Sequence, residues 1–414
     1  MKRLLRLVLL RLLALLARPF ARRPAASIGA VLYIKPDHLG DLLLATPALA
    51  ALRLRYPGAR ITALVGPWSE MALRRNPDVD ALLACPFPGF ERRPTTNDQR
   101  PTTNDPRGWL SFVVGRSSFV VHPYLTLLRY AALLRAGRYD LAIVGRDDHW
   151  WGAALAALAG VPRRVGFAVP ECRPFLTNAL PWDPRAHVTA QGLALVAAGE
   201  ASRPGDQEAG LQLAALRVLP KPRFDPAPED LAWADRWIAE QGLAGARLVV
   251  IHPGTGGPAK LWRPERWAAV ADALQQDGAR VALTGGPDEL ALAADIAERM
   301  RSAPLALAGR TSVGQLAALQ RRAALTLGVD SGPLHLAAAQ GAPTVHLYGP
   351  GDAGRFGPWG DPARQVVVRA ELWCSPCGVF GACPRGLAQP ECMDRIAVAQ
   401  VLAVARRLLD RAPC

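Results

Sequence analysis

Short apolar runs alternate with longer helical stretches along most of the chain. In the first half, runs typical of buried parallel strands lie at residues 30–34, 60–65, 141–144 and 164–167. Stretches with the apolar spacing of helices lie at residues 41–55, 123–136, 151–159 and 187–198. An alternation of strands and helices predicts an open α/β sheet with right-handed crossover connections.

The alternation stops at a proline-rich segment, 217–230, whose four prolines and mixed charges favour an extended linker. Beyond it, expected strands lie at 248–252, 280–284, 304–307, 324–328 and 344–348. Expected helices lie at 264–276, 287–300, 312–322 and 333–340. The sequence therefore predicts two Rossmann-like α/β domains. Ligands bind at the carboxyl ends of parallel strands, so two domains whose strand ends face each other would enclose an interdomain cleft.

Two segments depart from this pattern. "RPTTNDQRPTTNDP", at 93–106, repeats polar turn-forming residues that cannot bury a hydrophobic face, so a flexible insert without chemistry is expected over 88–108. Residues 1–26 form a separate basic amphipathic segment. The predicted organisation is 27–216 for the first domain, 217–230 for the linker, 231–395 for the second domain and 396–414 for a C-terminal helix.

Composition narrows the class of protein. The chain has 414 residues, is 50% hydrophobic and has a formal charge of +14, so a mostly disordered chain is excluded. The positive charge suggests nucleic acid, an anionic membrane surface or phosphorylated substrates as partners. Arginine supplies most of it, alongside abundant alanine, leucine and proline, which indicates a coding bias. Basic and aromatic residues do not interleave, so no nucleic-acid partner is expected.

Half of the excess charge lies in the first 24 residues, which contain no acidic residue. Arg6 and Arg11 interrupt the apolar run, so this segment resembles neither a secretory signal nor a membrane-spanning helix. One interpretation is an interfacial helix with leucines in the lipid and arginines at anionic headgroups, which would place the protein peripherally on the inner, cytoplasmic face of the cell membrane. The alternative is a surface helix packed on the fold, or a frayed extension.

Four of the seven cysteines, Cys374, Cys377, Cys383 and Cys392, form a C-x2-C-x5-C-x8-C pattern. The chain does not resemble a secreted disulfide scaffold, and a reducing cytoplasmic location fits better. Four thiolates could hold a structural zinc ion. The last two spacings match no common zinc pattern, so cysteines without a metal are favoured. No metal and no cofactor is expected.

The strongest motif is "LTLGVDSGPLHLAAAQGAPTVHLYG", residues 325–349. A strand ends at Gly328 and a helix begins near Pro333, which suits a first helical turn because proline lacks an N–H. Gly332 lets a ligand approach the backbone, and the N–H groups and dipole of the helix favour a phosphate or diphosphate. Asp330 would repel a phosphate and more plausibly accepts hydrogen bonds from a sugar. An ordinary helix cap by Asp330 or Ser331 is the alternative.

The second motif, "VVIHPGTGGPAKLWRPERW" at 249–267, joins a strand to a glycine-rich loop and a lysine. It resembles a dinucleotide fingerprint only weakly, because Pro258 and Pro264 interrupt the expected helix and no acid ends the next strand. A hydride-transfer cofactor is therefore rejected. Lys260 is one of four lysines in the chain and could neutralise a diphosphate leaving group. The alternative for Lys260 is a solvated surface lysine.

Two further acids are ambiguous. Glu289, in "TGGPDELALAADI", could hold ribose hydroxyls, but helix capping explains it equally well. In "YIKPDHLGDLLLATPAL", Asp41 follows Gly40 at an expected helix start and could take a proton from a hydroxyl. Asp37 precedes the turn and is expected to be a loop residue with polar contacts at most.

Taken together, "HLGDLLLATPAL", "HPG…AKLWRPERW", "GGPDE", "DSGPLHLAAA" and the cysteine-rich tail resemble the heptosyltransferase-type glycosyltransferases, family nine in the sequence classification. The resemblance spans roughly 28–410. It implies a GT-B architecture, with the acceptor on the first domain and the nucleotide-sugar donor on the second. It also implies inverting transfer without a catalytic metal, and a C-terminal helix that crosses back to the first domain.

The resemblance also implies roles for individual residues. Asp41 matches the general base, Lys260 the lysine on the donor phosphate, Glu289 the acid on the nucleotide ribose, and Asp330 a contact to the donor sugar. The expected donor site comprises Gly254, Thr255, Lys260, Glu289, Asp330, Ser331, Gly332, Leu334 and His335.

The function expected on this basis is transfer of heptose or a similar sugar from an ADP-heptose-like donor to a glycan or lipid-linked acceptor of the cell envelope. Two alternatives stay open. One is a membrane-docked nucleotide-sugar binding protein without catalysis, and the other is a different GT-B-like enzyme, such as a sugar-nucleotide epimerase.

Overall fold

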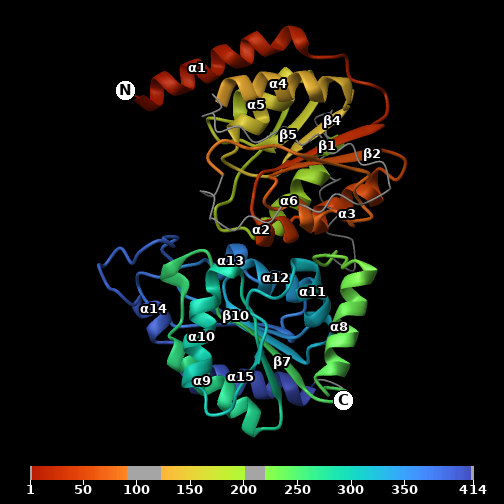
Figure 1. Ribbon diagram of the computed structural model, residues 1–414. Helices are drawn as coiled ribbons and strands as arrows, with labels where there is room; N and C mark the ends of the chain where they lie inside the picture. The colour runs from red at the N-terminus through yellow and green to blue at the C-terminus, as the bar shows by residue number, and fades with distance from the viewer. Residues whose placement is uncertain (1, 91–122, 201–219, 412–414) are drawn as a thin grey trace. The chain divides into compact units, whose positions relative to one another are not determined.

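The protein contains two α/β units, each built around one parallel sheet of six strands (Figure 1). The computed structural model describes residues 2–90, 123–200 and 220–411. Contacts group Met1–His38 and Ala45–Pro220 into the first unit, and Leu39–Leu44 and Lys221–Cys414 into the second. The predicted repeat insert lies almost entirely outside the described residues.

The first unit has the strand order β3-β2-β1-β4-β5-β6, all parallel. Its strands are β1 (Ala30–Lys35), β2 (Arg60–Val65), β3 (Ala81–Ala84), β4 (Leu141–Val144), β5 (Arg163–Phe167) and β6 (Asn178–Leu180). Its helices are α1 (Lys2–Ala17), α3 (Thr46–Arg55), α4 (Pro123–Ala136), α5 (Trp150–Leu158) and α6 (Val188–Ala197), with short 3-10 turns η1 (Arg18–Phe20), η2 (Glu70–Ala72), η3 (Arg173–Phe175) and η4 (Ala198–Glu200).

Helices cover both faces of this sheet. The alternate strand residues Leu32, Ile34 and Val144 join a core with α1, α4 and α5, which lie on one face (Figure 1). Helices α3 and α6 pack against each other. Strands β2 and β3 are added on one side of β1, and β4, β5 and β6 on the other side. The carboxyl ends of β1 and β4 therefore form the topological switch point, where open α/β sheets bind ligands.

The second unit repeats this topology, with the order β12-β11-β10-β7-β8-β9. Its strands are β7 (Leu248–His252), β8 (Arg280–Leu283), β9 (Leu305–Ala306), β10 (Leu325–Val329), β11 (Thr344–Tyr348) and β12 (Gln365–Arg369). Its helices are α2 (Leu39–Leu43), α8 (Pro228–Glu240), α9 (Pro264–Gln276), α10 (Leu290–Arg299), α11 (Val313–Arg322), α12 (Gly332–Ala339), α13 (Ala353–Phe356), α14 (Glu391–Asp394) and α15 (Val398–Arg411), with turns η5 (Pro258–Lys260) and η6 (Pro287–Glu289). Its switch point lies between β7 and β10.

The C-terminal helix packs within the second unit. Val401, Ala405 and Leu408 of α15 are buried in the core that α9 and the sheet share. Their spacing of four and three residues puts one apolar face on the sheet. The C-terminal helix was expected to cross back to the first domain. Its described part, α15, instead belongs to the core of the second unit.

Proline explains two differences between the expected and observed helices. The helix expected at 41–55 is two helices, because Pro47 lies in the first turn of α3 and cannot continue a preceding helix. Helix α8 begins at Pro228, inside the expected linker, where the Asp230 carboxylate accepts the Ala227 N–H at 3.2 Å. Strands β3, β6 and β12 were not expected, since each is short and mostly half-buried.

Candidate functional site

The start of α12 presents unused polar groups at the switch point of the second unit. Ser331 is the N-cap residue, with extended backbone, and its side chain makes no capping hydrogen bond. Its Oγ is buried and has no hydrogen-bond partner among the described residues. The ordinary helix cap considered from the sequence is therefore not formed by Ser331. The hydroxyl of Ser331 and the backbone of Gly332 remain as donors that a helix N-terminus offers to an anion.

Leu334 has a packing role at this site. Its side chain is fully buried, and a Cβ added to Gly328 would lie 2.3 Å from its Cδ2. Its N–H already donates to Ser331 O at 3.2 Å. The side chain of Leu334 thus packs α12 against β10.

Lys260 lies beside Asp330, at the carboxyl end of β10. Its Nζ donates to the Asp330 carbonyl at 2.7 Å and lies 3.3 Å from the Asp330 carboxylate. Thr255 Oγ1 donates to the same carbonyl at 3.3 Å. The ammonium also sits 4.9 Å from the centre of the Phe380 ring. The structure therefore brings Thr255, Lys260 and Asp330 together, and Lys260 is mostly buried, unlike a solvated surface lysine.

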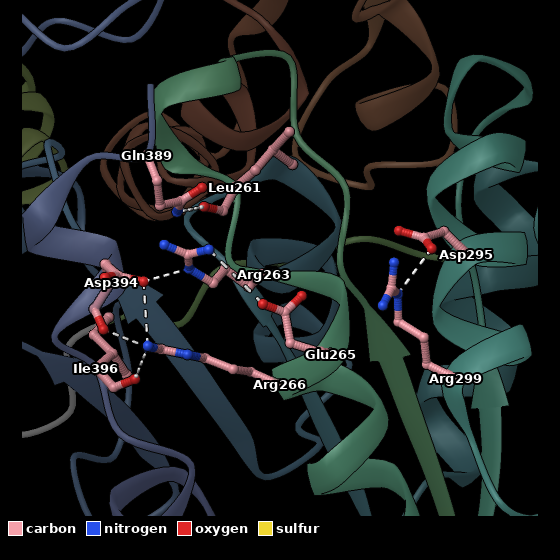
Figure 2. A network of polar contacts seen from close by, with 9 residues as sticks. All are labelled: Leu261, Arg263, Glu265, Arg266, Asp295, Arg299, Gln389, Asp394 and Ile396. Atoms are coloured by element: carbon pink, nitrogen blue, oxygen red, sulfur yellow. Dashed lines mark hydrogen bonds and ion pairs between the residues drawn. The ribbon is translucent and has the colours of Figure 1, made fainter. Parts of the chain in front are cut away.

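A polar network anchors the segment that follows Lys260 (Figure 2). Arg263 and Arg266, at the start of α9, both contact the carboxylate of Asp394 in α14. Gln389 donates to the Leu261 carbonyl at 3.2 Å. These contacts tie the lysine loop to the segment between the cysteines and α15, so the position of Lys260 is set by residues far away in sequence.

Glu289 lies between two glycine loops. Its Oε2 accepts the Gly286 N–H at 2.7 Å and lies 3.3 Å from His252 Nε2. A Cβ added to Gly254 would lie 2.0 Å from Glu289 Oε1, so only glycine leaves room for the carboxylate there. The capping expected of Glu289 is thus present, and the same carboxylate is also held at the end of β7.

Asp41 belongs to α2 and is half-buried. Beside it, a Cβ added to Gly40 would lie 3.2 Å from Gly332 Cα and 3.0 Å from His335 Cδ2. Burial raises the pKa of Tyr348 well above its usual value, and the charges of Asp330 and Asp41 raise it further. Asp41 is therefore placed near the start of α12, together with Asp330 and His335.

The four clustered cysteines do not form a metal site in this structure. All are free thiols, and Cys377 is exposed while Cys392 is buried. Across residues 2–90, 123–200 and 220–411, no group of three or more His, Cys, Asp or Glu side chains is placed to hold a metal ion. The zinc interpretation of Cys374, Cys377, Cys383 and Cys392 thus finds no support in the geometry.

A charged cluster that the sequence did not predict lies at the switch point of the first unit. Asp37, expected to make polar contacts at most, is 3% exposed and pairs with both Lys35, at 3.0 Å, and Arg146. Burial opposes ionisation of Asp37, but the charges of Lys35 and Arg146 outweigh it and lower its pKa to about 2. Asp148 pairs with Arg146 in turn. Charged residues directly after both β1 and β4 were the available signal.

The loop that leads from β1 toward Asp41 is held at several points in the first unit. Lys35 Nζ donates to Gly145 O at 2.9 Å, and the Trp68 indole donates to the carbonyls of Pro36 and Asp37, both at 3.2 Å. The chain therefore leaves β1 in a fixed conformation before it reaches α2.

Comparison with known proteins assigns the family. The model for glycosyltransferase family 9 (heptosyltransferase) matches residues 127–382, more than half of the chain. The chain belongs to glycosyltransferase family 9. This family 9 protein is thus a glycosyltransferase, as the resemblance of its motifs predicted.

Relatives of this family 9 protein cover most of its length. Lipopolysaccharide heptosyltransferase 3 of Escherichia coli is 28% identical over 334 residues, which are 79% of this chain and 85% of the relative. Lipooligosaccharide heptosyltransferase 2 of Haemophilus influenzae is 25% identical over 352 residues, which are 83% of this chain and 90% of the relative.

Solved structures share the fold. A family 9 glycosyltransferase from Veillonella parvula superposes with a TM-score of 0.73 at 23% identity, covering 94% of this chain and 99% of its own. The E. coli ADP-heptose LPS heptosyltransferase II superposes with a TM-score of 0.67 at 22% identity. The match covers 92% of this chain and 99% of the E. coli chain. The predicted α/β GT-B architecture is confirmed.

Proposed function

We propose that this family 9 glycosyltransferase transfers heptose from ADP-heptose to a lipopolysaccharide core acceptor. Its relatives are named lipopolysaccharide and lipooligosaccharide heptosyltransferases, and one solved structure with the same fold is described as an ADP-heptose enzyme. The observation that carries the proposal for this chain is the start of α12, where the uncapped Ser331 hydroxyl lies beside the sequestered Lys260–Asp330 pair.

The second unit is proposed to bind the donor. The diphosphate would lie at the N-terminus of α12, where Ser331, the Gly332 backbone and the helix dipole favour negative charge. Lys260 adds a full positive charge, and its low exposure strengthens that charge because water screens it poorly. Asp330 would accept hydroxyl hydrogen bonds of the sugar, and Glu289 those of the nucleotide ribose.

Asp41 is proposed as the general base. It would take the proton of the acceptor hydroxyl while that oxygen attacks the anomeric carbon from the side opposite the diphosphate, so the configuration inverts. Lys260 and the start of α12 would stabilise the charge that grows on the leaving ADP. The contact of Gly40 with Gly332 and His335 supports this role, since it places Asp41 near the proposed diphosphate site. The first unit is proposed to bind the acceptor.

The reaction itself can be tested with purified protein, ADP-heptose and lipopolysaccharide from a heptose-deficient strain. We expect release of ADP and a mass increase of one heptose on the acceptor. Asp41→Asn should lower the rate by roughly 100- to 10,000-fold while ADP binding stays unchanged. Donor binding without turnover in the wild-type protein would instead favour the binding-protein alternative.

The role of Lys260 is tested separately by ADP binding. Lys260→Ala should weaken binding of ADP, measured by calorimetry, by about 10-fold or more, because a charge-assisted hydrogen bond to phosphate is lost. Lys221→Ala is the matched control, since Lys221 is an exposed lysine of the same unit. Equal affinity in the Lys260 and Lys221 variants would contradict the assignment.

A further inference from the structure

Helix α1 has apolar side chains on two faces, one buried and one exposed. One face packs in the core of the first unit, where Leu10 and Ala17 are buried. The other face consists of Leu5, Leu9, Leu12 and Leu16, which are between 50% and 69% exposed. Their spacing of four, three and four residues makes a continuous stripe along the helix. A contiguous exposed apolar stripe of this kind marks an interaction surface.

Helix α4 adds a second apolar stripe to the same side of the unit. Leu127 and Leu134 are in the core, whereas Leu125 and Leu128 are 66% and 56% exposed. Both α1 and α4 pack on α5. The guanidinium of Arg135, near the end of α4, lies 4.8 Å from the centre of the Phe20 ring in η1, which joins the two elements.

We define the docking face as Leu5, Leu9, Leu12 and Leu16 of α1 with Leu125 and Leu128 of α4. Its charges all have one sign. Residues 1–36 and 123–139 contain no Asp or Glu. Arg6, Arg11, Arg18, Arg129 and Arg135 are exposed, and none of them forms an ion pair with a carboxylate within the part of the chain that the structure describes.

A cavity at the C-terminal end of α1 repeats this charge pattern. It has a volume of about 250 Å³ and lies between α1, α5, β5 and η3. Its charged lining residues are Arg18 and Arg164. The Arg164 guanidinium donates to the carbonyls of Val161 and Phe175 and pairs with no carboxylate among the described residues. Two guanidinium groups without a counter-ion favour a phosphate group at this position.

We propose that the docking face binds the surface of an anionic phospholipid bilayer, with α1 and α4 lying in the plane of the interface. The leucines would enter the acyl region, and the arginines would reach the phosphates beside them. The uniform positive charge selects this partner, because a protein partner would need a large matching acidic surface, whereas an anionic leaflet supplies negative charge everywhere. None of the described helices is long and apolar enough to cross a membrane.

This inference deepens the proposed function, because a lipid-linked acceptor is found at such a surface, but it rests on independent observations. The test is flotation of the full-length protein with vesicles of equimolar phosphatidylglycerol and phosphatidylcholine, compared with phosphatidylcholine alone. We expect flotation only with the anionic vesicles, and weaker flotation at high salt. The double variant Leu9→Glu/Leu12→Glu and the single variant Leu128→Glu should each reduce the bound fraction by ~10-fold.

The controls are Leu54→Glu in α3 and Leu290→Glu in α10, two leucines that are equally exposed outside the docking face. Both should float like the wild-type protein. Thermal unfolding and ADP binding check that every variant is folded. Equal flotation of all variants, or equal binding to neutral vesicles, would overturn the inference. So would a dimer in light scattering that Leu9→Glu/Leu12→Glu dissociates, because the docking face would then be covered by a second copy.

Transfer to detergent-dispersed acceptor separates the two proposals. If flotation fails and transfer persists, only the membrane inference is wrong. If flotation occurs and no heptose is transferred, only the proposed reaction is wrong.

Discussion

His149 shows how burial at a single residue fixes a protonation state. It lies after β4, packs against Phe87 and Trp151, and is 4% exposed. Neither ring nitrogen has a hydrogen-bond partner among the described residues. Burial, joined by the charge of Arg146, outweighs the nearby Asp37 and Asp148 carboxylates and lowers the pKa of His149 to about 3. The imidazole is therefore neutral across the physiological range.

This protonation state predicts a pH dependence of stability. An unfolded histidine takes up a proton below about pH 6.5, whereas folded His149 does not until about pH 3, so the unfolded state binds more protons in between. The free energy of unfolding should fall from pH 7 to pH 5, by about 2 kcal/mol from this residue. In His149→Gln, urea unfolding should show a shallower fall. Buried His346 also has a lowered pKa, but it contributes equally to the pH dependence of the wild-type protein and of His149→Gln. If the free energy of unfolding fell equally with pH in both proteins, the lowered pKa of His149 would be contradicted.

Asp37 shows what local sequence does not reveal about a residue. Its place before a glycine turn is typical of a loop aspartate, and that was the prediction. Its burial depends on Arg146, more than a hundred residues later, which the sheet order brings to the next strand end. Lys260 and Asp330, which the structure brings together, each had a local signal in the sequence: a glycine-rich loop before Lys260 and a helix start after Asp330.

At the scale of elements, the loop after β7 and the turn η6 after β8 depend on each other through Gly254. Alternating apolar runs predicted most strands within one residue, because buried parallel strands leave a strong local pattern. They did not predict the short strands β3, β6 and β12. The sequence also could not show that Gly254 is required by Glu289, since that contact joins two separate loops.

Gly254→Ala is predicted to separate stability from binding. The added Cβ would meet the end of the flexible Glu289 side chain, which can move away. The free energy of unfolding should therefore fall by only about 1 kcal/mol. The displaced Glu289 carboxylate would lose its hydrogen bond from the Gly286 N–H and its contact with His252. Because Glu289 is then no longer held in place for the ribose, ADP affinity should fall by roughly 10-fold. Gly381→Ala, which meets no atom within 4 Å, is the control in calorimetry and thermal unfolding. Unchanged ADP affinity of Gly254→Ala would contradict the role of Glu289.

At the scale of the whole molecule, the two units have the same strand order and different chemistry at their switch points. The first unit pairs a buried aspartate with Lys35 and Arg146, and the second pairs Asp330 with Lys260. Each unit has its own hydrophobic core. A perturbation at one switch point should therefore affect mainly its own unit.

Hydrogen exchange measured by mass spectrometry tests this separation. Asp37→Asn removes the carboxylate that pairs with the buried Lys35 ammonium and leaves Arg146 with Asp148 alone, which should cost roughly 3 kcal/mol and speed exchange in peptides of the first unit. ADP should slow exchange of the wild-type protein in peptides from 252–262 and 328–336, in the second unit, because a ligand of the native state suppresses local opening. In Asp37→Asn, the protection by ADP should be the same as in the wild-type protein. Loss of that protection would show that the first switch point contributes to donor binding, and the assignment of the donor to the second unit alone would then fail.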